Sequence, residues 1–280
     1  MKILVTALYV NGLVSEGGSS LFMKSLIDNL RMLGHDVVAS DRPETIDDND
    51  FDLIISSHNY ILNKIKHRVH RSPIFHIGQG IIADELFVSG ATRYYSISEE
   101  VANVNYIKRN IASNILPQPI ELQQIKPINN TLQNILIVRR YEMENDPFNQ
   151  LHNYFNVKIS DQTTDIIPQM EWADLCITLG RGALQAMSLG RTVLVGDNRR
   201  YMGPIGDGYV SPANVLEIAR CNFSGRRYKM HITTDWLLRE LSKYSPSHSQ
   251  HMHKYIELCH DAKKVAQKLL LEYHQHITNR

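Results

Sequence analysis

Residues 172–198 read WADLCITLGRGALQAMSLGRTVLVGDN, and this stretch decides the predicted fold. Residues 174–178 (DLCIT) and 192–196 (TVLVG) are short apolar runs, which are typical of buried parallel strands. Between them, residues 183–189 have the composition of a helix, and Gly180 and Gly182 lie in the turn before it. The stretch therefore predicts a right-handed β-α-β unit.

The same alternation of strands and helices extends through most of the chain. Further strands are expected at 2–9, 36–39, 52–56, 73–77, 93–97, 134–138 and 157–160, and further helices at 147–154 and 166–172. The first helix carries the apolar stripe Phe22, Leu26 and Leu30, can be capped by Ser19 or Ser20, and ends before Gly34. A later helix is expected to begin after Ser98.

A polar stretch at residues 121–133 contains Pro127 and lacks hydrophobic periodicity, so it is the predicted domain boundary. We expect an α/β protein with two Rossmann-like domains, residues 1–122 and 134–233. Residues 234–280 are expected to form a C-terminal helical segment that packs back across the domains.

Composition narrows the class of protein. Of the 280 residues 43% are hydrophobic, and 30 Lys and Arg against 29 Asp and Glu give a net charge of +1, with no overall attraction to nucleic acid. Three scattered cysteines indicate a reducing compartment, and we expect a cytoplasmic protein without a transmembrane segment. The histidines of the C-terminal region match no zinc spacing, so no metal is expected.

The turn Gly180-Arg181-Gly182-Ala183 is the first candidate site. Two glycines let a backbone approach a ligand closely, a helix N-terminus offers amide groups to a phosphate, and Arg181 adds a cation. The other interpretations are a tight turn with an exposed arginine, or a nicotinamide site, because Asp197 follows the next strand. Gln185 occupies the third small position of that dinucleotide fingerprint, which is therefore incomplete.

Arg139 and Arg140 follow the strand at 134–138 and are the second candidate, because a pair of arginines can clamp a diphosphate. A surface pair bridged to nearby glutamates is the alternative.

The first half offers candidate groups for the acceptor or the sugar. Glu16, Gly17 and Gly18 lie in a loop after the first strand, and this pattern fits a substrate loop or a merely flexible one. His58 and His76 lie near strand ends, where an imidazole could deprotonate a hydroxyl group. A lone histidine in a strand is more often structural. We rank His76 first as the catalytic group, ahead of Glu16 and His58.

Several of these segments together resemble a known family. Residues 172–198 look like the donor-binding segment of GT-B glycosyltransferases of the family-4 type, and residues 134–140 (NILIVRR) are similar to the strand and arginine that open their C-terminal domain. Gly17-Gly18, residues 33–37 (LGHDV), 97–99 (ISE) and 116–120 (LPQPI) resemble elements of their N-terminal domain. Residues 206–210 (GDGYV) and 222–226 (NFSGR) resemble a bacterial subgroup.

The resemblance implies two Rossmann-like domains that face a central cleft and a metal-independent sugar transfer from a nucleotide-sugar to a hydroxyl acceptor, such as a glycan or lipid-linked sugar. A peripheral membrane contact is compatible with such an acceptor. Arg139 or Arg140 and the backbone of Gly180–Ala183 would hold the diphosphate, and Gln185 stands where the family has a ribose-binding glutamate. Ile177 replaces the paired upstream glutamate. The alternatives are a nicotinamide-dependent oxidoreductase and a non-catalytic nucleotide-sugar-binding protein.

Overall fold

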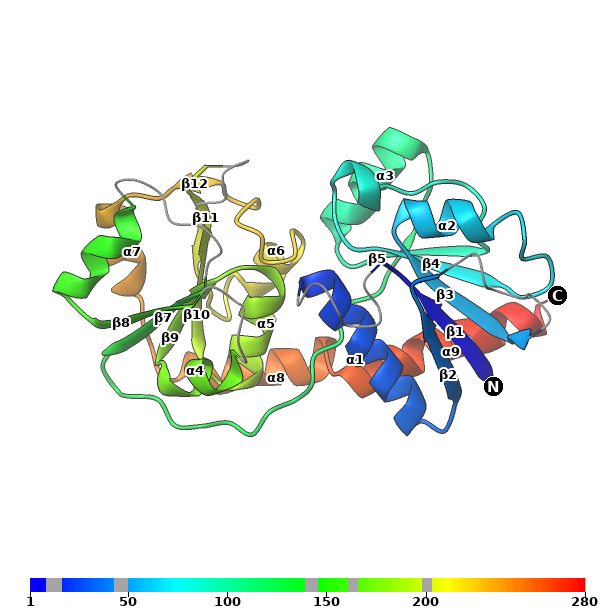
Figure 1. Ribbon diagram of the computed structural model, residues 1–280. Coiled ribbons are helices and arrows are strands. Elements are labelled where there is room, and N and C mark those ends of the chain that lie inside the picture. The colour runs from blue at the N-terminus through cyan, green and yellow to red at the C-terminus, as the bar shows by residue number, and fades with distance from the viewer. Residues whose placement is uncertain (9–16, 43–49, 139–145, 161–165, 198–202, 280) are drawn as a thin grey trace. The chain divides into compact units, whose positions relative to one another are not determined.

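The computed structural model describes residues 1–8, 17–42, 50–138, 146–160, 166–197 and 203–279. The chain divides into two compact units (Figure 1). Unit 1 comprises Met1–Pro119 and Asp261–Arg280, and unit 2 comprises Ile120–His260. The residues from 234 onward are thus shared, because two of their helices belong to unit 2 and the last belongs to unit 1.

Unit 1 contains a six-stranded sheet in the order β2-β1-β3-β4-β5-β6, and every pair of neighbouring strands is parallel. Its strands are β1 (Lys2–Thr6), β2 (Asp36–Ser40), β3 (Leu53–Ser57), β4 (Ile74–Gly78), β5 (Arg93–Ser96) and β6 (Asn114–Ile115). Its helices are α1 (Gly18–Met32), α2 (Asn59–Ile65), η3 (Ala83–Glu85), α3 (Glu99–Arg109) and α9 (Ala262–Thr278). The five longer strands predicted in this half are confirmed, with bounds shifted by one to three residues.

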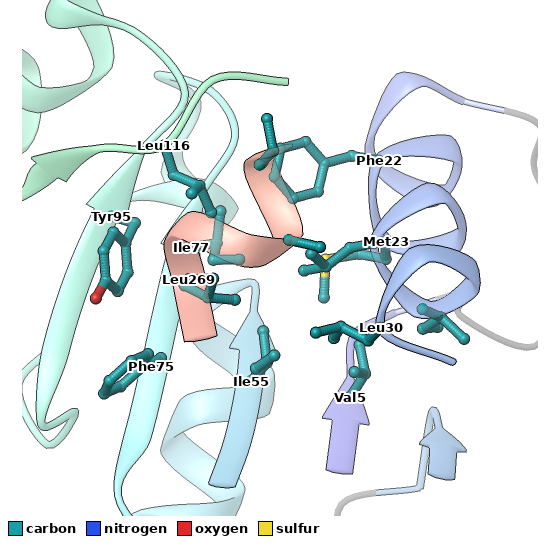
Figure 2. Packing of buried hydrophobic residues seen from close by; sticks show 14 of the residues in the cluster. Val5, Phe22, Met23, Leu30, Ile55, Phe75, Ile77, Tyr95, Leu116 and Leu269 are labelled. Carbon is teal, nitrogen blue, oxygen red and sulfur yellow. The ribbon is translucent and has the colours of Figure 1, made fainter. Parts of the chain in front are cut away.

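The core of unit 1 lies on both faces of this sheet. Because side chains alternate along a strand, Ile3 and Val5 enter one core whereas Leu4 enters the other. Figure 2 shows the first core, where Phe22 and Met23 of α1 and Leu269 of α9 pack with side chains of the central strands. Leu62 and Ile65 of α2 belong to the second core.

The ends of two helices test the predicted caps. Gly17 is the N-cap of α1 and makes no side-chain capping bond, so the expected cap by Ser19 or Ser20 is wrong. Gly34 follows the last residues of α1 with φ +85°, as expected of a glycine after a helix. Ser98 caps α3, since its side chain accepts a hydrogen bond from the Val101 backbone N–H.

Unit 2 contains a six-stranded sheet in the order β12-β11-β10-β9-β7-β8. Its strands are β7 (Asn134–Val138), β8 (Asn156–Ser160), β9 (Leu175–Thr178), β10 (Thr192–Asp197), β11 (Ile205–Tyr209) and β12 (Met230–His231). Its helices are η4 (Pro147–Asn153), α4 (Ile167–Trp172), α5 (Gly180–Ser188), α6 (Val215–Ala219), α7 (Thr234–Leu241) and α8 (His248–Cys259). The helix predicted at 147–154 is a 3-10 helix.

This second sheet is mixed: the four strands predicted in this half are parallel, and two further strands, which were not predicted, run antiparallel. Strands β8, β7, β9 and β10 are parallel, whereas β11 runs antiparallel to β10, and β12 antiparallel to β11. Residues 198–204 are too few for a crossover, which needs a dozen or more residues to return to the start of a parallel strand. The chain therefore turns back along β10.

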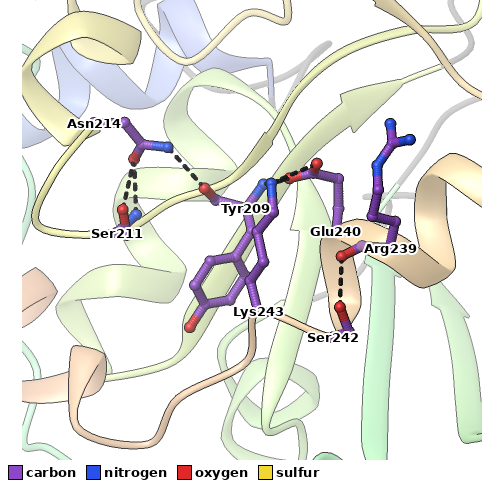
Figure 3. Close-up of polar contacts among 7 residues, drawn as sticks. All are labelled: Tyr209, Ser211, Asn214, Arg239, Glu240, Ser242 and Lys243. Atoms are coloured by element: carbon purple, nitrogen blue, oxygen red, sulfur yellow. Dashed lines mark hydrogen bonds and ion pairs between the residues drawn. The ribbon is translucent and has the colours of Figure 1, made fainter.

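The side chain of Glu240 in α7 accepts a hydrogen bond from the backbone of β11 (Figure 3). Its carboxylate is buried, and Oε2 accepts a 3.1 Å hydrogen bond from the Tyr209 backbone N–H and a 2.6 Å bond from Lys243 Nζ. Gly208 has φ +87°, and a Cβ there would collide with the Glu240 carboxylate. The glycine thus lets the carboxylate approach the strand.

The polar stretch at 121–133 is fixed to unit 2 by two buried side chains. Asp174 accepts hydrogen bonds of 2.9, 3.1 and 2.9 Å from the backbone N–H groups of Asn129, Gln133 and Asn134. Arg191, only 1% exposed, donates to the carbonyl oxygens of Ala173, Pro127 and Lys126. Residues 121–133 are thus held in place as part of unit 2, although their sequence lacks hydrophobic periodicity.

Candidate functional site

The turn from β9 to α5 has the geometry of a close-approach turn. Helix α5 begins at Gly180, three residues earlier than predicted, so both glycines lie in its first turn. Gly180 has φ +50°, a conformation that favours glycine. A Cβ at Gly182 would collide with Oγ1 of Thr178, which is fully buried at the end of β9. Gly180 is therefore favoured by its backbone conformation, and Gly182 by the local packing.

A second loop is joined to this turn. The Gly180 N–H donates a 2.8 Å hydrogen bond to the carbonyl oxygen of Phe223, in the connection between α6 and β12. Asn222 and Phe223 have φ values of +54° and +51°, and Gly225 has +78°. Two consecutive left-handed residues other than glycine are costly, and such strain is concentrated at functional sites. The sequence gives no sign of it, except that 222–226 belong to the family resemblance.

Asp207 of β11 holds the far end of this loop. Its Oδ1 accepts a 2.7 Å hydrogen bond from the Tyr228 backbone N–H. Burial raises the pKa of Asp207, and hydrogen bonds from the loop backbone, with Tyr228 first among them, oppose that shift. The carboxyl group thus ties the α6–β12 loop to the sheet that carries the turn.

Arg181 supplies positive charge beside the turn. Burial lowers the pKa of its guanidinium to about 10, and the charge of Glu121 opposes the shift. A group with this pKa keeps its proton at neutral pH, so the first turn of α5 carries a positively charged side chain. Ala183 is fully buried and offers only its backbone, whereas the side chain of Gln185 is partly exposed one turn further on.

Arg139 and Arg140 lie outside the described residues, as does Glu16. The strand before the arginines, β7, ends at Val138 and pairs with β9 through Ile137 and Ile177. Parallel neighbours end at the same edge of a sheet, so β7 ends at the edge that carries the β9–α5 turn. The roles of the two arginines stay predictions.

In unit 1, His76 is an interior residue of β4. Its ring is fully buried, Nδ1 lies 2.9 Å from Ser56 Oγ, and the ring packs edge-on against Phe87 and Tyr94. Burial, followed by the charge of His58, lowers the pKa of His76 to about 3. Its catalytic role stays a prediction, and complete burial favours a structural one.

His58 lies at the turn from β3 to α2 and is strained. Its φ of +68° and ψ of +135° lie in a region that residues other than glycine rarely adopt, at a cost of roughly 1–3 kcal/mol. The side chain is partly buried, and its Nδ1 has no hydrogen-bond partner among the described residues. Burial lowers the pKa of His58, whereas the Ser57 backbone and the charge of Asp84 oppose the shift.

Polar side chains join the turn at His58 to the end of β4 and to the segment that follows it. Ser57 Oγ donates to the Ile77 carbonyl oxygen at 2.9 Å and accepts from Gln79 Nε2 at 3.1 Å. Asn59 Nδ2 donates a 2.9 Å bond to the Ala83 carbonyl oxygen in η3. Both neighbours of His58 are thus anchored to one segment, which sequence reasoning did not identify.

The glycines predicted as a substrate loop lie at the start of α1. Gly17 is the N-cap and Gly18 the first helical residue, and the hydroxyl of Ser19 lies 3.4 Å from Glu85 Oε1.

Among the described residues no group of three His, Cys, Asp or Glu could hold a metal ion. Within the same residues no helix is long and apolar enough to cross a membrane.

The two Rossmann-like sheets and the C-terminal helices define the fold class as GT-B-like. No model of a known protein family matches the chain, and no curated protein matches it either. Solved structures do match over nearly the whole length, at identities so low that they show the fold alone.

Three examples with TM-scores above one half follow. One is an alpha-glucosyltransferase in complex with UDP and a 13-mer DNA containing an HMU base (TM-score 0.60, 9% identity, 98% of this chain and 99% of that one). Another is HepE of Anabaena in complex with UDP and glucose (0.58, 13%, 97% and 99%). A third is AviGT4, a glycosyltransferase involved in avilamycin A biosynthesis (0.56, 12%, 100% and 98%).

Proposed function

We propose that the protein is a glycosyltransferase that moves a sugar from a nucleotide-sugar to a hydroxyl acceptor. The observation that carries the proposal is the Gly180–Arg181–Gly182 turn and its bond to the strained α6–β12 loop, at the carboxyl edge of the second sheet. In open α/β sheets, ligands bind at this edge. The GT-B-like fold and the UDP complexes among the similar structures support the same assignment.

In the proposed reaction, positive groups of the protein stabilise the negative charge that develops on the leaving nucleoside diphosphate. The bond between the anomeric carbon and the diphosphate breaks, the acceptor oxygen bonds to that carbon, and the acceptor proton leaves. The departing nucleoside diphosphate gains negative charge, which the amides of the β9–α5 turn and the Arg181 cation can stabilise. We assign Arg139 and Arg140 to the same diphosphate on the strength of the sequence resemblance.

The finer assignment is a metal-independent enzyme of the family-4 type. Gln185 stands at the proposed ribose position, where an amide can donate and accept hydrogen bonds. Because arginines and backbone amides supply the positive charge, sugar transfer is expected to continue in EDTA. The scattered cysteines support a reducing compartment such as the cytoplasm.

A donor screen tests the proposal. The protein is incubated with UDP-, GDP-, ADP- and dTDP-sugars, and mass spectrometry follows the release of nucleoside diphosphate and free sugar. In parallel, thermal shifts with UDP, GDP and NAD are compared. We expect stabilisation by one nucleoside diphosphate and slow hydrolysis of its sugar conjugate. Stabilisation by NAD alone would instead establish the oxidoreductase alternative.

Two variants test whether the binding of nucleoside diphosphates depends on the β9–α5 turn. Arg181→Gln removes the charge and is expected to weaken nucleoside diphosphate binding about 10- to 100-fold, as for a lost charge-assisted hydrogen bond. Arg239→Gln is the matched control, because Arg239 is exposed on α7 of the same unit, away from the turn and the α6–β12 loop. Equal affinities in the two variants would remove Arg181 from the proposed site.

Once the donor is known, a panel of acceptors is tested with it. A panel of simple glycosides, a lipid-linked sugar and an oligonucleotide with a hydroxymethylated base covers glycan, lipid and nucleic-acid hydroxyls. The oligonucleotide is included because one similar structure holds DNA. The net charge of +1 favours the first two classes.

A further inference from the structure

The connection between α6 and β12 carries positive charge on the surface of unit 2. Residues 220–231 contain four Lys or Arg and no Asp or Glu. Within them, residues 227–231 (RYKMH) are all exposed, and we call these five the basic segment. Charges act over about 8 Å at physiological salt, so the local balance, rather than the net charge of +1, decides what this surface attracts.

The carboxylates beside the connection do not remove this charge. Glu217 of α6 pairs with both Arg220 and Arg227, so one negative group is shared by two guanidinium groups. Exposed ion pairs of this kind are weak, and they exchange readily for a stronger partner. Asp197 and Asp207 are buried in the strands next to the connection. The exposed face of the connection is therefore positive.

The backbone of the basic segment is fixed. Asp207 Oδ1 accepts a 2.7 Å hydrogen bond from the Tyr228 N–H. Lys229 has φ +54°, which residues other than glycine rarely adopt and which the surrounding structure must hold. The last two residues of the segment form β12, which pairs with β11. Because its backbone is already formed, the segment loses less conformational entropy when a partner binds.

This surface lies at the carboxyl edge of the second sheet. Strand β12 pairs with Ile205 and Gly206 at the start of β11, and these residues pair with the last two residues of β10. At the other end of the same connection, the Phe223 carbonyl oxygen accepts the hydrogen bond from the Gly180 N–H. A partner held by the basic segment therefore lies at the edge of unit 2 to which we assign the nucleotide-sugar.

We propose that the basic segment binds a nucleic acid, and that the sugar acceptor is a hydroxyl group of that nucleic acid. Arg227 and Lys229 supply the positive charge that binds phosphate groups. Tyr228, between them in the sequence, is 43% exposed and can stack on a base. An acidic glycan offers charge without a planar base, so the exposed ring favours a nucleic acid.

The choice of acceptor rests on the proposed function, whereas the binding of nucleic acid does not. In the transfer, the oxygen of the nucleic-acid hydroxyl bonds to the anomeric carbon. The bond from that carbon to the diphosphate breaks, and its electrons leave with the nucleoside diphosphate. The hydroxyl proton passes to water.

Fluorescence anisotropy with the full chain tests the binding. The probes are a labelled oligothymidylate and a labelled duplex of the same length, at NaCl concentrations from about 50 to 200 mM. We expect at least one probe to bind, with an affinity that falls as the salt concentration rises. The probe that binds more tightly is then used for the variants.

Arg227→Gln with Lys229→Gln removes two phosphate contacts. We expect this double variant to weaken binding about 10- to 100-fold and to lower the slope of log affinity against log salt by about 2, one for each contact. Tyr228→Ala removes the ring and keeps the charge. It is expected to weaken binding about 5- to 150-fold while the slope stays unchanged, because stacking on a base releases no counterions.

Lys158→Gln with Lys254→Gln is the matched control, because it removes the same charge elsewhere in unit 2. Lys158 lies on β8, at the opposite edge of the sheet, and Lys254 pairs with Glu257 on α8. The control is expected to keep the affinity and the salt slope of the wild type. UDP affinity, measured by calorimetry, is expected to stay unchanged in every variant, which shows that each remains folded.

Transfer is tested with a single-stranded oligonucleotide that carries a hydroxymethylated base, and with UDP-glucose as the first donor. We expect the oligonucleotide to gain the mass of one hexose. The double variant of Arg227 and Lys229 is expected to raise KM for the oligonucleotide more than it lowers kcat, because it loses binding and keeps the donor site.

The inference is overturned if neither probe binds the wild type, or if the double variant and the control bind equally well. It is also overturned if a heparin oligosaccharide binds more tightly than both probes and equally well to Tyr228→Ala, or if a glycoside is glycosylated and the bound oligonucleotide is not. Sugar transfer to a glycoside leaves the proposed function standing in each case. If the wild type binds a probe but no nucleoside diphosphate, the proposed function fails and the acceptor assignment with it, while the nucleic-acid surface stands.

Discussion

The backbone N–H of Gly180 donates a 2.8 Å hydrogen bond to the carbonyl oxygen of Phe223. The bond joins the first residue of α5 to a loop that lies more than forty positions later in the chain and has left-handed residues of its own. A displacement of either segment would therefore stretch or break this hydrogen bond. Changes in the packing of the turn are expected to affect both the stability of unit 2 and its affinity for nucleotides.

Gly182→Ala tests the packing of this turn. The added methyl group would collide with Oγ1 of Thr178, a buried side chain at the end of β9, so we expect a loss of about 1–3 kcal/mol in the free energy of unfolding. UDP affinity is expected to fall as well. Denaturant unfolding and calorimetric titration measure the two effects.

The double variant Thr178→Ala with Gly182→Ala is the control for that collision. It removes the oxygen that the new methyl group would meet, and it is expected to recover most of both losses. If the double variant is no better than Gly182→Ala alone, the collision does not explain the effect.

Arg191→Met tests the attachment of residues 121–133 to unit 2. The substitution keeps the length of the side chain but leaves the buried carbonyl oxygen of Ala173 and the partly buried one of Pro127 without this donor. A buried group without its partner costs roughly 1–3 kcal/mol, so we expect a loss of about 2–3 kcal/mol in the free energy of unfolding. Arg220→Met, at an exposed ion pair, is expected to lose less than about 1 kcal/mol. Comparable losses in the two variants would contradict this role for Arg191.

Because the ring of His76 is buried, we expect the free energy of unfolding to depend on pH. Its pKa is lowered to about 3 in the folded protein, against 6.5 as the ordinary value, so the unfolded chain binds a proton that the folded one excludes. The associated stability is present above pH 6.5 and is lost as the pH falls towards 3, at about 1.4 kcal/mol per pH unit below 6.5. His76→Gln removes this titration and can still accept the hydrogen bond from Ser56.

Unfolding by denaturant at pH 7 and at pH 4.5 measures the difference. The wild type is expected to lose about 2–3 kcal/mol more than His76→Gln between the two values, because two pH units below 6.5 correspond to that amount. Parallel losses in the two proteins would show that the ring is protonated freely in the folded state.

Much of the fold could be predicted because its strands are short apolar runs separated by helices. The strand at 134–138 was predicted with the bounds that β7 has, and the glycine after α1 was predicted from the end of an apolar stripe. Strand β11 was missed, because Ile205–Tyr209 (IGDGY) contains two glycines and an aspartate, which local propensity disfavours in strands. Its place depends on β10 and on Glu240, and both are distant contacts.

The candidate site could be predicted only where its chemistry is local. The glycines at 180 and 182 indicated a close-approach turn, and the structure gives a conformational reason for Gly180 and a packing reason for Gly182. The strain at His58, Asn222 and Phe223 could not be predicted, because those residues adopt positive φ under tertiary constraints. The position of His76 in an apolar strand favoured a structural histidine, but the full enclosure of its ring depends on tertiary packing.

Unit 1 is assembled from two pieces of chain that are separated by the whole of unit 2. Val265, Leu269 and Tyr273 of α9 complete the core around α1, so this core is unfinished while residues 1–119 alone have emerged from the ribosome. Residues 120–260, in contrast, are contiguous and emerge before α9. During synthesis, the unit encoded second can therefore reach its native packing first, whereas the N-terminal sheet keeps an apolar face uncovered until α9 arrives.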